Sequence, residues 1–568
     1  MKGTDLFQLV FFIVLFLLLA WPFGRYMAAV YTGKRTFLDP VLSPLEKLFY
    51  RLSGVDPDHE MGWWEYAVAA MTLNILGIVV LFLIQLVQGY LPLNPQHFPG
   101  VRWDLALNTA VSFVTNTNWQ SYGGETTMSY LTQMSGLVVQ QFVSAATGMA
   151  VLIALVRALI RRRASTIGNF WVDLTRTGLW ILLPVSIVCA LAFASQGVIQ
   201  TLHPYVTAQT LEGAKQTIAL GPVASMEAIK MLGSNGGGFF NVNSAHPFEN
   251  PSPLTNLLIM LLIMLIPAGL VFTYGRMVDD RRQGHAILGA MLIMFVIFLG
   301  VCYYSEATGN PLISALHVSS PTAMEGKEVR FGIADSVLFA TTTTAVANGA
   351  VNAMHDSLTP LSGFITMLQI KLGEVVFGGV GCGLYGMLVF VLLTVFIIGL
   401  MVGRTPEYLG KKIESMEIKM GILAVLLPSA CILIGAAIAS VTKVGTSSIL
   451  NPGPHGLSEI LYAFASAAGN NGSAFAGLNA NTVFYNLSLA FNMFVGRYGV
   501  MIPVLAIAGS MVKKKTVPPG PGTFQTTGPF FAVVLASVVI IVGALTFFPA
   551  LALGPLVEHL LMWSGRVF

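Results

Sequence analysis

Four short clusters of glycine, asparagine, serine and threonine recur along this sequence at nearly equal intervals. Their tetrapeptides end at residues 118, 236, 349 and 472, so successive ends lie 118, 113 and 123 residues apart. The four are Thr115-Asn116-Thr117-Asn118, Gly233-Ser234-Asn235-Gly236, Val346-Ala347-Asn348-Gly349 and Gly469-Asn470-Asn471-Gly472. One feature per unit at a fixed period indicates an internal repeat.

These residue types suit the binding of a bare monovalent cation. Backbone carbonyls replace the water around K⁺ in channel filters, whereas a divalent cation favours carboxylates, and the tetrapeptides contain no Asp or Glu. We expect Gly236, Gly349 and Gly472 to give the backbone access to positive φ. One such cluster is also typical of an ordinary external turn, but four in register favour an ion filter.

The composition places most of the chain in a bilayer. Of 568 residues, 55% are hydrophobic and 10% are charged, whereas soluble domains carry about 25% charged residues. Ten stretches are apolar over about 20 residues, the length that spans a bilayer. They are 6–30, 63–90, 129–156, 171–195, 254–275, 285–304, 375–402, 418–440, 483–509 and 529–553. The seventh could begin nearer 362, because the glycine-rich run 373–386 indicates an interruption. The first is interpreted as a retained helix rather than a signal peptide, since Asp5 spoils a basic leading segment.

Basic residues predict the orientation. The links after the first, third, fifth, seventh and ninth stretches, with the adjoining helix ends, carry 20 of the 30 Lys and Arg. The positive-inside rule makes that side cytoplasmic and leaves both termini outside. The other links contain the four clusters, and each cluster follows an apolar segment too short to span. These segments are expected to be re-entrant half-helices whose negative C-terminal ends attract cations.

The predicted fold class is therefore an all-α polytopic membrane protein. It has about ten transmembrane helices and four pseudo-symmetric repeats of helix, re-entrant pore loop and helix around one central pore. The expected divisions are 1–61 for the first helix and its link, 62–163, 164–283, 284–413 and 414–515 for the four repeats, and 516–568 for the last helix.

Several longer motifs resemble the KdpA family, the potassium-translocating subunits of bacterial Kdp ATPases. They are SNGGGFFNVNSAHPFENPSPLTN, GEVVFGGVGCGLYGM, GRTPEYLGKKIE and GNNGSAFAGLN. The resemblance implies a channel-like subunit in the bacterial inner membrane, related to a superfamily of K⁺ transporters. It also implies the partners KdpB, a P-type ATPase subunit, and the small subunits KdpC and KdpF. K⁺ would be the transported ion, Mg-ATP would act only at KdpB, and neither an organic cofactor nor nucleic acid is expected.

The resemblance also suggests roles for particular residues. The family filter maps onto Asn116, Thr117, Asn118, Ser234, Asn235, Gly236, Ala347, Asn348, Gly349, Asn470, Asn471 and Gly472. The third loop departs from the Ser-Cys-Gly form of some members. Gln120 is expected to support the first loop, or else to be a solvated residue at the outer mouth. Arg404 is expected to oppose leakage near the cytoplasmic side of the pore, or else to be a positive-inside anchor.

Two other function classes remain open on the sequence alone. One is a K⁺ transporter or channel of the same superfamily that works alone or with a cytosolic regulator. The other is a metabolite transporter, which would show two inverted halves rather than four like-oriented repeats. The chain contains neither a G-x-x-x-x-G-K-[ST] nor a D-K-T-G motif, so we expect a partner to hydrolyse ATP.

Overall fold

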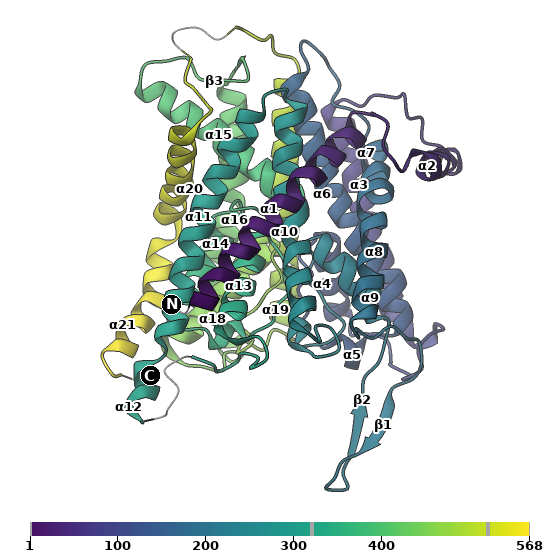
Figure 1. Cartoon of the computed structure of the whole chain (residues 1–568), viewed down its shortest axis with the longest axis vertical. Helices are drawn as coiled ribbons and strands as arrows, with labels where there is room; N and C mark the ends of the chain where they lie inside the picture. The colour runs from purple at the N-terminus through teal and green to yellow at the C-terminus, as the bar shows by residue number, and fades with distance from the viewer. Residues whose placement is uncertain (1–2, 318–322, 519–522, 567–568) are drawn as a thin grey trace.

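The computed structural model describes residues 3–317, 323–518 and 523–566. Within these ranges ten helical segments are long and apolar enough to cross a membrane, and each overlaps a predicted stretch. Figure 1 shows them packed side by side into one bundle. They are α1 (Gly3–Tyr31), α3 and η1 (Trp63–Tyr90), η2 and α6 (Thr132–Ile160), α7, η3 and α8 (Phe170–Ser195), α10 (Pro253–Met277), α11 and α12 (Arg281–Ala315), α15 (Cys382–Met401), α16 (Ser415–Val441), α19 (Val483–Met511), and α20, η6 and α21 (Pro529–Trp563).

Half-helices lie between alternate pairs of these segments. They are α4 (Trp103–Val114), α9 (Val223–Leu232), α13 (Gly332–Ala345) and α18 (Gly453–Gly469). With at most 17 residues, each is shorter than the about 20 that a bilayer requires. The half-helices lie in the lower half of the bundle in Figure 1, and each polar tetrapeptide begins where its half-helix ends. The predicted fold class, with its four re-entrant repeats around one axis, is confirmed.

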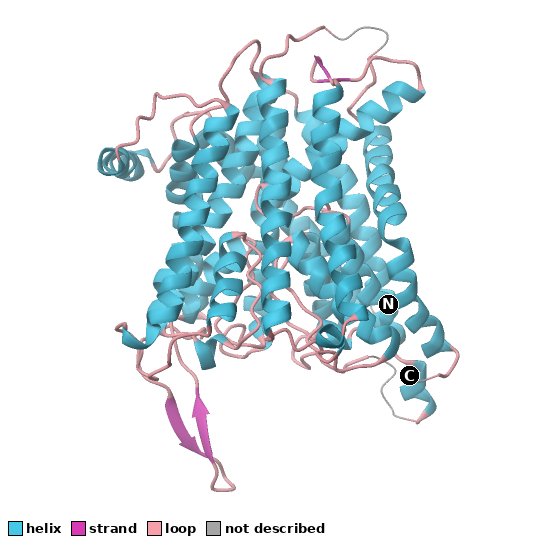
Figure 2. Cartoon of the chain, turned by 180° about the vertical axis from the view of Figure 1, so that it is seen from behind, coloured by secondary structure: helices cyan, strands magenta, loops and turns pink. Residues whose placement is uncertain are grey.

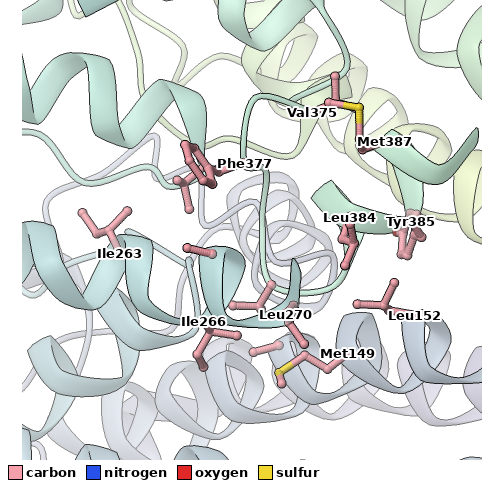
Figure 3. Close-up of a cluster of buried hydrophobic side chains, with 14 of the residues drawn as sticks. Met149, Leu152, Ile263, Ile266, Leu270, Val375, Phe377, Leu384, Tyr385 and Met387 are labelled. Atoms are coloured by element: carbon pink, nitrogen blue, oxygen red, sulfur yellow. The ribbon is translucent and has the colours of Figure 1, made fainter. Parts of the chain in front are cut away.

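The seventh predicted span is interrupted, as its glycines indicate. A short helix α14 (Pro360–Lys371) is followed by irregular chain until α15 begins at Cys382. Gly381 has φ +83°, and a Cβ there would lie 2.1 Å from the Gly148 carbonyl oxygen, so only glycine allows this approach. In Figure 3 this irregular chain supplies Val375 and Phe377 to a hydrophobic layer completed by α6, α10 and α15. Irregular backbone is tolerated at this depth because protein surrounds it.

The links with most basic residues meet at one end of the bundle. Lys411 Nζ donates to the carbonyls of Ala158 and Met511 at 2.8 and 2.7 Å, which joins three of these links. At the same end lie α2 (Asp39–Ser53) and the hairpin of β3 (Glu407–Tyr408) and β4 (Lys411–Lys412). This shared end is the arrangement that the charge pattern predicts.

The opposite end carries a projecting hairpin. Strands β1 (Val206–Gln209) and β2 (Lys215–Ile218) pair antiparallel, with Val206 opposite Ile218. Figure 2 shows this hairpin extending well beyond the helices. Shorter elements here are α5 (Gly124–Thr127), η4 (Asn243–Ala245), η5 (His355–Ser357) and α17 (Lys443–Thr446).

Candidate ion-selective site

The four tetrapeptides touch one another in sequence order. From the first loop, Asn116 Nδ2 donates to the Ser234 carbonyl at 3.0 Å. In the reverse direction, Asn235 Nδ2 of the second loop donates to Asn116 Oδ1 at 2.7 Å. From the third loop, Gly349 N donates to the Asn235 carbonyl of the second at 3.3 Å. Three of the four loops are thus joined by hydrogen bonds within a buried polar layer.

The fourth loop closes the ring. Asn471 Nδ2 donates to the carbonyl of Thr343, the residue three before the third tetrapeptide, at 3.3 Å. On its other side Asn470 Nδ2 donates to Thr117 Oγ1 of the first loop at 2.9 Å. Segments separated by more than 350 residues of sequence therefore complete one closed ring, which is held together by the side-chain amides of Asn116, Asn235, Asn470 and Asn471.

Each loop is held from behind by the half-helix that precedes it. In the second loop, Asn235 N and Gly236 N lie 2.9 and 3.1 Å from the Lys230 carbonyl oxygen. In the other loops the accepting carbonyls belong to Ser112, Thr343 and Ser466, each three residues before its tetrapeptide. A trans peptide directs its C=O opposite to its N–H, so the carbonyl of the second residue in each tetrapeptide faces away from the half-helix. This geometry leaves carbonyl oxygens for a cation.

Backbone strain in the loops falls where the sequence did not predict it. The second residue of every tetrapeptide has positive φ although none is glycine: Asn116 68°, Ser234 51°, Ala347 53° and Asn470 60°. At the fourth position Gly236 and Gly472 have φ of 91° and 98°, as expected. Gly349 does not, so the expectation was wrong there. Its missing side chain instead allows close approach, because a Cβ would lie 3.0 Å from Gly472.

The second loop is braced by a buried ionic cluster. Lys230 Nζ lies 2.7 Å from Glu227 Oε2 and 2.8 Å from Glu249 Oε2, and all three side chains are inaccessible to solvent. Lys230 Nζ also donates to Asn243 Oδ1 at 3.1 Å, and Asn243 Nδ2 donates to the Gly236 carbonyl at 2.8 Å. The ion pair thus fixes the last residue of the tetrapeptide through one amide. The sequence interpretation missed this cluster, although a lysine inside an apolar half-helix was its visible signal.

Gln120 connects the first and second loops. Its Oε1 accepts from Gly238 N at 2.9 Å, and its Nε2 donates to the Gly238 carbonyl at 3.1 Å. This two-way contact is the geometry that a supporting residue requires. Arg404, in contrast, lies exposed at the end of α15, with Nη1 3.4 Å from the Thr523 carbonyl.

A cavity beside the fourth loop is lined by three ionisable side chains. Lys371, Glu374 and Arg497 all face it, together with Asn470 of the fourth loop. Arg497 is buried within α19 and donates to the Ser144 carbonyl at 3.0 Å. An arginine inside a spanning helix is a functional candidate by default, which was the signal available in the sequence. Here Arg497, rather than Arg404, shares a cavity with a loop residue, Asn470.

Four re-entrant half-helices meeting around one axis, with carbonyls gathered between them, define a channel-like cation transporter. The family model described as KdpA, the potassium-transporting ATPase A subunit, matches residues 10–560, and the chain belongs to this family.

Relatives of this chain cover its full length. Proteins called potassium-transporting ATPase potassium-binding subunit include one from Sorangium cellulosum (strain So ce56), 56% identical over 99% of this chain and 100% of the relative. One from Serratia proteamaculans (strain 568) is 57% identical over 100% of both chains. Among solved structures, the potassium transporter TrkH from Vibrio parahaemolyticus aligns with TM-score 0.50 at 15% identity, covering 86% of this chain and 96% of that one. That likeness shows a shared fold.

Proposed function

We propose that this chain binds K⁺ from the extracytoplasmic side and passes it into the membrane part of an ATP-driven uptake complex. The observation that carries the proposal is the closed ring of four loops, whose amides are tied back to the half-helices. The second residue of each tetrapeptide offers a carbonyl oxygen, and four half-helix C-termini add negative potential. The residues proposed for the filter are the twelve named from the family pattern, with Gln120 as support.

The cavity beside the fourth loop suggests why K⁺ would not pass straight through the ring. Arg497 brings positive charge beside the fourth loop, where it repels a K⁺ that leaves the ring. We therefore assign the barrier first to Arg497, and leave Arg404 as a further cytoplasmic cation whose role is to be tested.

The energy source belongs to a partner in this proposal. The relatives are called subunits of a potassium-transporting ATPase, and the chain lacks nucleotide and phosphorylation motifs. We propose KdpB as the subunit that uses Mg-ATP, with KdpC and KdpF completing the complex in the bacterial inner membrane. The four repeat boundaries and the external position of both termini belong to the same proposal.

Reconstitution tests the assignment against a self-sufficient transporter. The purified chain alone should hydrolyse no ATP, and K⁺-stimulated hydrolysis should appear when the P-type partner is added. K⁺ flux through liposomes that contain only this chain, at the rate of the complex, would favour the stand-alone alternative. Orientation is tested separately with cysteine at Lys515: an impermeant reagent should label it only after the cells are permeabilised.

A further inference from the structure

A basic cavity opens between α1 and α10 at the end of the bundle that we assign to the cytoplasm. Its volume is about 410 Å³. Four cationic residues line it: Arg25, Lys34, Arg276 and Arg281. Asp279 is the single acidic residue among the described lining residues. A cavity of this size accommodates a small ligand, and its charge selects an anion.

Close helix packing builds the cavity. A Cβ on Gly24 would lie 2.5 Å from the Gly269 carbonyl oxygen, so α1 and α10 approach at glycines. Thr273 Oγ1 donates to the Gly24 carbonyl at 3.0 Å and fixes this contact. Arg25 follows directly, and the tight turn after α10 brings Arg281 back over it. The four cations therefore converge because of backbone geometry.

The charges in the cavity are not neutralised by the protein. Across residues 3–317, 323–518 and 523–566, none of Arg25, Lys34, Arg276 and Arg281 forms an ion pair, while the neighbouring Arg282 pairs with Asp280 at 3.0 Å. Basic residues at helix C-termini on the cytoplasmic side are ordinary membrane anchors, but anchors can point separately into water. Arg25, Lys34 and Arg281 are exposed and Arg276 is half-buried, so water screens part of their mutual repulsion and a bound anion would relieve the rest.

The surface beside the cavity indicates a lipid rather than a soluble anion. Deeper along α1, Trp21 and Leu18 are 49% and 63% exposed on the outside of the bundle, so an apolar track continues from the basic cavity. The Arg25 guanidinium carbon lies 5.5 Å from the Trp21 ring centroid and joins the two. A basic pocket between helices on the cytoplasmic side is the arrangement that binds anionic headgroups.

We propose that this cavity binds the phosphate headgroup of an anionic phospholipid from the cytoplasmic leaflet, with the acyl chains along α1. The inference rests on the proposed orientation but not on the proposed filter. The phosphate group is shared with soluble phosphates, so the test must separate the two sources.

Native mass spectrometry of the purified complex measures this binding directly. The complex is titrated with phosphatidylglycerol, with phosphatidylcholine and with inorganic phosphate. Phosphatidylglycerol should bind at least about tenfold more tightly than phosphatidylcholine. The variant R25Q/R276Q/R281Q should lose this preference. The charge-matched control R162Q/K513Q/K515Q changes exposed basic residues of other links and should keep it.

The possible outcomes separate cleanly. Equal binding of both lipids by the unmodified complex overturns the proposal, as does equal loss in the control variant. Inorganic phosphate that displaces phosphatidylglycerol at similar concentrations would assign the cavity to a soluble anion. Unchanged K⁺-stimulated ATP hydrolysis of R25Q/R276Q/R281Q in phosphatidylcholine discs shows that the variant is folded, and this readout also keeps the test independent of the filter proposal.

Discussion

The second and third loops occupy equivalent places in the ring, yet different chemistry holds them. Behind the second loop, Lys230 and two glutamates form a buried ionic cluster that reaches Gly236 through Asn243. Behind the third, the hydroxyl oxygen of Thr343 lies 2.5 and 2.7 Å from the Asn348 and Ala350 carbonyl oxygens, which share its one proton. Lys230 and Thr343 lie at the same position, three residues before their tetrapeptides.

The difference teaches that the fold requires one backbone carbonyl at this position but not one particular side chain. A hydroxyl satisfies the loop directly and adds no net charge. An ion pair adds strong hydrogen bonds, yet it leaves uncompensated charge if either partner is removed. The second loop should therefore be the part of the ring that is most sensitive to substitution, and the following predictions test this, beginning with the largest effect.

Lys230→Met should have the largest effect. It leaves Glu227 and Glu249 buried without their cation, a loss of about 3–5 kcal/mol. Thermal unfolding and K⁺-stimulated ATP hydrolysis of the complex measure stability and apparent K⁺ affinity, and both should fall. Lys327→Met breaks another fully buried ion pair, with Glu306 at 2.8 Å, away from the ring. Lys327→Met should lower stability but leave the apparent K⁺ affinity unchanged. Equal K⁺ affinity in both variants would contradict a role for Lys230 in the loop.

Gly236→Ala should impair ion selectivity while the protein still inserts. The new Cβ would lie 2.1 Å from Gly349 N, and a φ of 91° adds strain of about 1–2 kcal/mol. Apparent K⁺ affinity should fall at least about tenfold, with weaker discrimination against Rb⁺ and Na⁺. Gly403→Ala is the matched control, since Gly403 has φ 69° and open space around its Cβ position. Unchanged ion order in Gly236→Ala would refute the filter assignment.

Thr343→Val should have a moderate effect. It preserves shape but removes the one hydroxyl donor that two loop carbonyls share, which costs about 1–3 kcal/mol. The adjacent Thr342 is equally buried, and its hydroxyl finds no partner among the described residues. Thr342→Val should therefore be neutral or slightly stabilising in thermal unfolding. A larger loss in Thr342→Val than in Thr343→Val would show that the hydroxyl contacts do not brace the loop.

Gln120→Ala should have the smallest effect of the series. It removes the two-way contact with Gly238, worth about 1 kcal/mol, at a partly exposed site that water can enter. Apparent K⁺ affinity should fall a few fold, with little change in unfolding temperature. Gln200→Ala is a suitable control, because Gln200 makes a similar contact with Ser225 at the surface. Identical K⁺ affinity in the two variants would show that Gln120 is a solvated residue that does not support the first loop.

Much of the architecture follows from the sequence alone. Hydropathy located all ten spans, since the cost of placing polar residues in lipid acts residue by residue. The run 373–386 marked an interruption because its glycines break a helix locally. Basic links predicted which loops share an end, and the spacing of the clusters predicted four loops in one ring.

The tertiary structure decided how those loops work. Positive φ at Ala347 and the ordinary φ of Gly349 depend on contacts with neighbouring loops, which residue type alone does not reveal. Lys230 and Glu249 are 19 residues apart, and Arg497 reaches the Ser144 carbonyl across more than 350 residues. Such partners are chosen by packing in three dimensions. Local propensity and periodicity therefore determined where the chain crosses the membrane, whereas only the folded ring determined which buried charges lie beside the loops.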